Sequence, residues 1–180
     1  MYGLVNKAVV DLVCSKFGQD TWNKIKQKAD VDIDVFVSMD GYPDEITYRL
    51  VGAASDVLGI TPEQVLEAFG EHWVLYTAAE GYGPLLSASG KSLREFLMNL
   101  DALHARVALT MPDLRPPRFR LVDTGPHTMT LEYHSTRQGL APMVVGLLRG
   151  LGVRFSTPIE IAHQRRAEHD DFLITLKQAG

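Results

Sequence analysis

The chain has 180 residues, 46% of them hydrophobic and 22% charged, which is typical of one globular domain and excludes disordered and fibrous architectures. Its net charge is −4 and its acidic and basic residues are interspersed, which gives little support for a nucleic-acid partner. No apolar run reaches membrane-spanning length, no signal peptide is evident, and the single cysteine, Cys14, excludes an internal disulfide, so we expect a cytoplasmic protein without membrane contact.

Helical patterns fill the first part of the chain. Apolar residues recur there every three or four positions, and glycines close two of the runs. The predicted helices cover residues 4–18, 21–28 and 44–58. Thr61-Pro62-Glu63-Gln64 then combines a capping box with proline at the first helical position, which predicts a further helix that places Trp73 on its apolar face.

A glycine-rich stretch, residues 81–90, is expected to form a connection. Ser92-Leu93-Arg94-Glu95 is a second capping box and predicts the start of another helix. We expect that helix to continue to the Thr110-Met111-Pro112 segment and to carry His104 on its buried side with Phe96, Leu97, Leu100 and Val107.

The periodicity changes to that of strands after Pro117. Residues 118–122 and 128–135 predict a hairpin, residues 140–151 a helix, and residues 157–164 and 170–176 two more strands. This order predicts an α+β fold with a four-stranded antiparallel sheet.

Three polar residues lie at alternate positions at the end of the second strand. Because side chains in a strand alternate between its faces, Tyr133, Ser135 and Arg137 should continue the face of Met129 and Leu131. Arginine can bind a carboxylate with two parallel hydrogen bonds, and the hydroxyls add neutral donors. The triplet could therefore bind a pair of carboxylates, although a polar strand face in water is the commoner explanation of such a pattern.

His104 is the histidine with an apolar setting. Burial would favour its neutral ring, which is the form that binds metals, yet a helix-face histidine is more often an ordinary core residue. The other histidines adjoin charged or turn residues and are expected at the surface. Paired cysteines or a His-x-x-x-His pattern for zinc, a nucleophile elbow and a phosphate loop are all absent from the sequence. The sequence thus predicts no catalytic constellation.

A haem pocket needs one axial nitrogen, apolar walls and a polar clamp for two propionates. The N-terminal Met-x-Gly helix, His104, Pro116-Pro117 and Tyr133-x-Ser135-x-Arg137 together resemble the H-NOX family of haem nitric oxide and oxygen binding domains, over essentially the whole chain and at the length of a stand-alone bacterial member. The resemblance implies one haem domain over residues 1–180, with a helical lobe (1–60), a lobe of haem-ligating helices and sheet (61–180), and haem b buried between them. Without a Cys-x-x-Cys-His motif, that haem would be non-covalent.

The resemblance also implies roles for individual residues. His104 matches the proximal iron ligand, Pro117 matches a proline that presses on the macrocycle, and Tyr133, Ser135 and Arg137 match the propionate clamp. The positions that match the distal wall are Val5, Trp73, Met143 and Leu147.

Family resemblance further implies a gas sensor rather than an enzyme. Oxygen-binding members resemble this chain but carry a tyrosine where Met143 stands, so we expect binding of nitric oxide and carbon monoxide and poor binding of oxygen. Release of His104 and relief of haem strain would shift a helix and signal to a separate effector, either a histidine kinase or a cyclic-dinucleotide enzyme. Two alternatives remain open, a peroxidase-like haem enzyme and a module that binds another apolar ligand with His104 in its core.

Overall fold

The computed structural model describes residues 1–177, except the side chains of Asp123 and Thr124. The helices are α1 (Gly3–Phe17), α2 (Gln19–Lys28), α3 (Asp44–Leu58), α4 (Pro62–His72), the π-helical turn η1 (Trp73–Thr77), α5 (Ala78–Ala88), α6 (Leu93–Met98), α7 (Leu100–Ala108) and α8 (Ala141–Arg154). The strands are β1 (Arg118–Thr124), β2 (Thr128–His134), β3 (Ile159–Arg165) and β4 (Asp170–Leu176). The predicted α+β fold with a four-stranded antiparallel sheet is confirmed.

Local signals determine the boundaries of α3 and α4. Gly59 ends α3 with φ +67°, a left-handed conformation that glycine adopts without strain. Thr61 Oγ1 accepts a hydrogen bond from Gln64 N at 3.3 Å, and Gln64 Oε1 accepts one from Thr61 N at 2.9 Å. This capping box satisfies two amides that would otherwise lack partners at the helix start, and it confirms the predicted start of α4.

The prediction of a connection at residues 81–90 was wrong, because most of this stretch belongs to α5. Tyr82 has non-helical angles (φ −131°, ψ 18°) and kinks the helix two residues before Pro84. The kink lets the proline follow a break instead of interrupting a regular turn. Leu86 of this helix is buried in the same core cluster as the inward-facing residues of the sheet. The free energy gained by this packing outweighs the low helix propensity of the glycines.

The prediction of one continuous helix between Ser92 and the Thr110-Met111-Pro112 segment was also wrong. Asn99 has φ −97° and ψ 5°, and its Nδ2 donates to the carbonyl oxygen of Ser89 at 2.9 Å. The break separates α6, which buries Phe96, from α7, which carries His104. Competition of this kind between an asparagine side chain and the helical backbone is common at helix ends.

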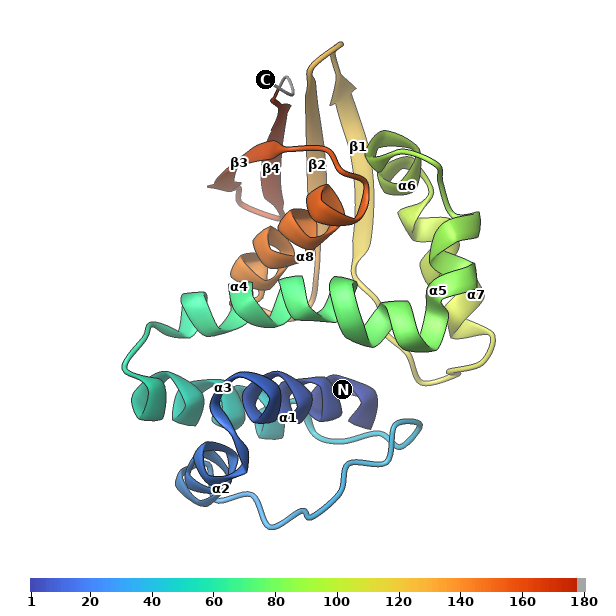
Figure 1. Cartoon of the computed structure of the whole chain (residues 1–180). Helices are drawn as coiled ribbons and strands as arrows, with labels where there is room; N and C mark the ends of the chain where they lie inside the picture. The colour runs from blue at the N-terminus through green and yellow to red at the C-terminus, as the bar shows by residue number, and fades with distance from the viewer. Residues whose placement is uncertain (178–180) are drawn as a thin grey trace.

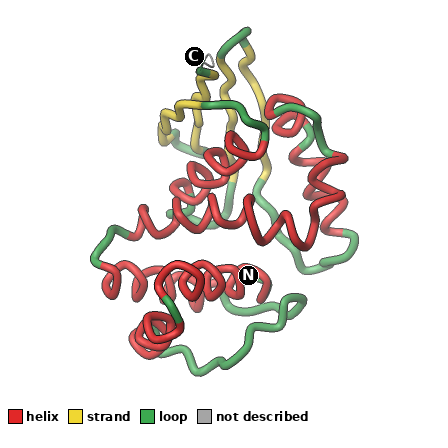
Figure 2. The backbone as a smooth tube through the Cα atoms, viewed as in Figure 1, coloured by secondary structure: helices red, strands yellow, loops and turns green. Residues whose placement is uncertain are grey.

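Strand order in the sheet is β1-β2-β4-β3. Along β2 the side chains of Met129, Leu131 and Tyr133 are buried and alternate with more exposed ones, so one face of the sheet packs in the core. Helix α8 lies between the sheet and α4, while α1 to α3 lie beyond α4 (Figure 1). Figure 2 shows the same separation, with the strands at one end of the molecule and α1 to α3 at the other.

The buried residues form two clusters. The first joins α1 to α4 and includes Phe69, and the second joins η1, α5 to α8 and the sheet and includes Phe172. Trp73 packs against both clusters. Between α4 and α8 the backbones are close, because a Cβ atom added at Gly70 would overlap the Met143 carbonyl oxygen and one added at Gly146 would overlap that of Glu67. Among the helices of residues 1–177, we find none with the length and apolarity needed to span a membrane.

Candidate functional site

His104 projects from α7 toward the first strand of the sheet. Its ring centroid is 5.8 Å from that of Phe119. Burial lowers the pKa of His104, and the nearby Asp101 carboxylate only partly opposes this, so the ring is held in its neutral form. Its Nδ1 atom is buried and has no hydrogen-bond partner within residues 1–177. A neutral imidazole with an unpartnered nitrogen is able to coordinate a metal.

Tyr133 also packs against Phe119. The ring centroids of Phe119 and Tyr133 are 5.3 Å apart, and the two residues are paired between β1 and β2. Burial raises the pKa of the Tyr133 hydroxyl, and a hydrogen bond with Ser135 partly opposes this. The hydroxyl therefore stays protonated at neutral pH and can donate to an anion.

The prediction that Ser135 and Arg137 continue the strand face of Tyr133 was wrong. Strand β2 ends at His134, and Arg137 N donates to Ser135 Oγ at 3.0 Å. Serine side chains that capture a backbone amide two residues later favour turns, which explains why the strand ends here. The two residues remain close to each other, but through a turn and not through strand alternation.

The guanidinium of Arg137 reaches the N-terminal helices. Its Nε donates to Asp44 Oδ2 at 2.6 Å, and one of its terminal nitrogens donates to the Arg115 carbonyl oxygen at 2.8 Å. Nearby, the Tyr48 hydroxyl donates to the Gln138 carbonyl oxygen at 3.1 Å. Partial burial would raise the pKa of Asp44, but hydrogen bonds from Arg137 and the amino terminus hold it below its ordinary value. The turn after β2 is thus tied to α3.

Pro117 is partly buried in the loop before β1, two residues from Phe119. The four predicted distal residues come from three parts of the chain, and all are partly buried. Val5 on α1 and Met143 on α8 pack against the first cluster, Leu147 on α8 packs against the second, and Trp73 packs against both. Trp73 thus lies at the junction of the two clusters, while Val5 and Met143 belong with the first cluster and Leu147 with the second.

The chemistry of the predicted site residues fits a large planar cofactor with one axial site and two carboxylates. His104 offers an unpartnered ring nitrogen, and Tyr133 is linked to it through Phe119. Ser135 and Arg137 offer further donors in the turn that follows β2. That donor set and the apolar residues between the clusters are what haem requires. A surface hollow lined by Asn23, Lys26, Gln27, Asp30, Val31 and Asp32 contains none of these residues.

Two neighbours of the site were not predicted. Phe119 could have been found from its place on the inward face of β1, where it alternates with exposed arginines. Asp44 gave no such signal, because an acidic residue in a first helical turn is ordinary helix chemistry and its partner is 93 residues away in the sequence. Another cluster, on the outer face of the sheet, was also missed.

Comparison with known proteins finds one family and several relatives. The family model "Haem-NO-binding" matches residues 2–163. Soluble guanylate cyclase gcy-35 of Caenorhabditis elegans is 32% identical over 180 residues, which cover 97% of this chain and 26% of that protein. Soluble guanylate cyclase gcy-32 of the same organism is 31% identical over 172 residues, covering 93% and 25%. The chain thus spans about a quarter of the length of these relatives.

Solved structures share the fold over the full chain. An H-NOX protein from S. oneidensis in the Fe(II)NO ligation state has a TM-score of 0.89 at 22% identity, with 99% of this chain and 100% of that chain covered. The Fe(II) unliganded H-NOX protein from K. algicida has a TM-score of 0.87 at 22% identity, covering 99% and 98%. At this level of identity the likeness shows the fold.

Proposed function

The chain belongs to the Haem-NO-binding, or H-NOX, family of haem-based gas-sensor domains, and on this premise we propose that it binds haem b non-covalently and senses nitric oxide and carbon monoxide. The observation that carries the proposal is the neutral His104 ring, whose buried Nδ1 lacks a partner among residues 1–177. Phe119 contacts both this ring and Tyr133. In this assignment His104 is the axial ligand.

Haem would supply the ferrous iron at which the gases bind. Tyr133, Ser135 and Arg137 would donate hydrogen bonds to its propionates, and Arg137 would supply the permanent positive charge. Arg137 bonds Asp44 through Nε and the Arg115 carbonyl through another nitrogen, so a propionate would share or replace these partners. Pro117, next to this region, would press on the macrocycle as its family counterpart does.

The distal wall would decide which gas binds. Of Val5, Trp73, Met143 and Leu147, only the indole of Trp73 carries a polar hydrogen. Bound oxygen gains from a hydrogen-bond donor because negative charge develops on its outer atom, whereas nitric oxide binds ferrous iron strongly without one. Met143 stands where oxygen-binding members carry a tyrosine and offers no hydroxyl, so we assign poor oxygen binding to this chain, with the Trp73 N–H as the one donor in the wall.

Signalling would use the connections between the two lobes, residues 1–60 and 61–180. Release of His104 would free α7, and the turn after β2 would pass the change to α3 through the Arg137–Asp44 ion pair and the Tyr48–Gln138 hydrogen bond. A separate effector, a histidine kinase or a cyclic-dinucleotide enzyme, would need only to bind the two states with different affinity. We assign no catalytic step to the domain itself.

Absorption spectra of the reduced protein test this function. We expect haem to co-purify or to reconstitute, and the Soret band to shift on addition of nitric oxide and of carbon monoxide. Exposure to air should produce no spectrum of an oxygen complex. A persistent oxygen complex would overturn the gas assignment. A protein that stays colourless after incubation with haem would overturn the sensor function as a whole.

A further inference from the structure

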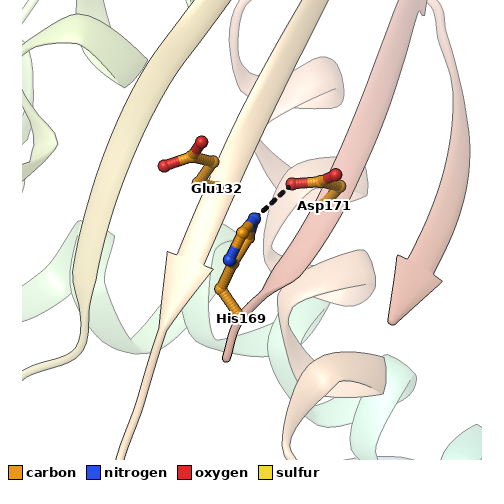
Figure 3. Close-up of side chains that lie close together, drawn as sticks. All are labelled: Glu132, His169 and Asp171. Atoms are coloured by element: carbon orange, nitrogen blue, oxygen red, sulfur yellow. Dashed lines mark ion pairs between the residues drawn. The ribbon is translucent and has the colours of Figure 1, made fainter. Parts of the chain in front are cut away.

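The outer face of the sheet, opposite the core, brings together ligand-type side chains from two strands. Glu132 on β2 is paired directly with Asp171 on β4, and His169 precedes β4 by one residue. One oxygen of each carboxylate and a ring nitrogen of His169 all lie within 4.8 Å of one another. Figure 3 shows the three side chains on the same face, with the ion pair between His169 and Asp171 at 3.1 Å.

These side chains are largely covered although they lie on the outer face of the sheet. The exposed fractions are 12% for Glu132, 15% for Asp171 and 25% for His169. Two carboxylates directly opposite each other on neighbouring strands repel, so their pairing requires compensating positive charge. The protein supplies part of it through Arg120, which bonds Glu132 at 2.9 and 3.2 Å, and Arg166, which bonds Asp171 Oδ2 at 2.6 Å.

We propose that Glu132, His169 and Asp171 form a binding site for a divalent transition-metal ion, with Zn²⁺ as the best fit. One imidazole and two carboxylates are a suitable donor set, because zinc accepts both nitrogen and oxygen ligands and imidazole favours transition metals over Ca²⁺ or Mg²⁺. Zinc ligands at about 2.0–2.2 Å in tetrahedral geometry lie about 3.3 Å from one another. Side-chain rotations that bring the three donor atoms from within 4.8 Å to that spacing complete the site, with water as the fourth ligand.

His134 supports the site from the same face. Its Nε2 is 3.1 Å from Glu132 Oε2, and its ring stacks on that of His169 with centroids 4.8 Å apart. It therefore holds one ligand by a hydrogen bond and a second by ring contact, as residues around a metal site commonly do. His134 is a positioning residue in this arrangement.

The two arginines compete with the ion but do not block it. Arg166 bonds only Oδ2 of Asp171, which leaves Oδ1 beside His169. The side chains of Arg120 and Arg166 are 70% and 48% exposed, so each can swing into water when an ion arrives. The ion would join β2 to β4 immediately beside Tyr133, and would stabilise the folded chain because the unfolded chain lacks the site.

Zinc titration of the haem-loaded full chain, after treatment with a chelator, tests the site. Calorimetry should show one saturable site and a higher unfolding temperature with zinc. His169→Ala and Glu132→Gln should each weaken binding by about tenfold or more, since even supporting residues of metal sites have effects of this size. His127→Ala removes an exposed histidine outside the cluster and should leave binding unchanged.

Zinc-edge X-ray absorption should show nitrogen and oxygen ligands without sulfur, which excludes binding at Cys14.

Arg120→Ala gives a test that does not depend on losing a ligand. Removal of this competitor for Glu132 should tighten zinc binding, although it removes an ion pair from the folded protein. The proposal is overturned if the wild-type chain shows no saturable binding. It is equally overturned if zinc binds as tightly to His169→Ala and Glu132→Gln as to the wild type.

Discussion

Arg137 and Asp44 form an ion pair, with 2.6 Å between Nε and Oδ2, that joins the turn after β2 to the first turn of α3. The same arginine is proposed to hold a haem propionate. Mutation can separate the two roles. Replacing Arg137 removes the donor to the propionate, whereas replacing Asp44 removes only the carboxylate that competes with the propionate for Arg137.

Arg137→Ala should therefore release haem faster, by about tenfold or more, since hydrogen bonds to charged groups contribute about 1.5–3 kcal/mol. Asp44→Asn should retain haem at least as well as the wild type, because Arg137 is then free to bind a propionate. Haem transfer to an excess of apomyoglobin measures both rates. Equal loss in the two variants would indicate that the ion pair, and not the propionate contact, retains the cofactor.

His104→Gly should lose the axial ligand while keeping the clamp residues. We expect the purified variant to contain little haem with a wild-type spectrum, and added imidazole to restore that spectrum by filling the space of the missing ring. His127→Gly serves as the control, because His127 is exposed in the β1–β2 turn. A wild-type spectrum of His104→Gly without imidazole would remove His104 from the ligand role.

Met143→Tyr tests the source of gas selectivity. A tyrosine at this position of α8 should offer a hydroxyl to bound oxygen, as the resemblance to oxygen-binding members implies, and the reduced variant should then form an oxygen complex in air. Met143→Phe adds a ring of similar size without the hydroxyl and should not. If both variants bind oxygen equally, pocket shape rather than hydrogen bonding controls the choice.

Gly146→Ala should destabilise the protein, because the added methyl group would overlap the carbonyl oxygen of Glu67 where α8 packs on α4. Overpacking of this kind costs about 1–3 kcal/mol. Gly52→Ala is the matched control, since Gly52 lies in α3 with no atom within 4 Å of an added Cβ, and alanine should stabilise that helix by about 0.5–1 kcal/mol. Urea unfolding at equal haem loading compares the two. Destabilisation of the same size at Gly52 would show that the loss at Gly146 does not come from overlap with Glu67.

Glu132 should make stability depend on pH in acid. Hydrogen bonds from Arg120 and His134 lower the pKa of Glu132 to about 2 from its ordinary value of 4.5. A carboxyl with a lower pKa in the folded state stabilises it fully above the ordinary value, and this contribution is lost as the pH falls toward about 2. In the presence of a chelator, Glu132→Gln should thus unfold more easily than the wild type at pH 6, and the difference should shrink as the pH is lowered.

The control for this pH series is Glu168→Gln. Glu168 is exposed in the β3–β4 turn, and the part of the chain that the structure describes gives it no ion-pair partner. Its stability profile should run parallel to that of the wild type. A constant difference between Glu132→Gln and the wild type from pH 6 to pH 2.5 would show that the Arg120 pair contributes nothing.

The sequence by itself determined the elements whose signals are local. The capping box at Thr61, the glycine after α3 and the alternation along β2 each report backbone preferences of a few neighbouring residues, so their positions could be read directly. The residue motifs around His104 and Tyr133 likewise indicated the family, which the comparisons show.

Only the tertiary structure decided features that depend on contacts between distant residues. The glycine-rich stretch is helical because Leu86 packs in the core. The hydrogen bond from Asn99 to Ser89 divides the helix that was expected to carry both Phe96 and His104. The Arg137–Asp44 pair and the cluster around His169 arise from elements that lie far apart in the sequence or come from different strands. Pairing of this kind leaves no periodic pattern, because strand register and helix packing are set by the whole core and not by the residues that then come into contact.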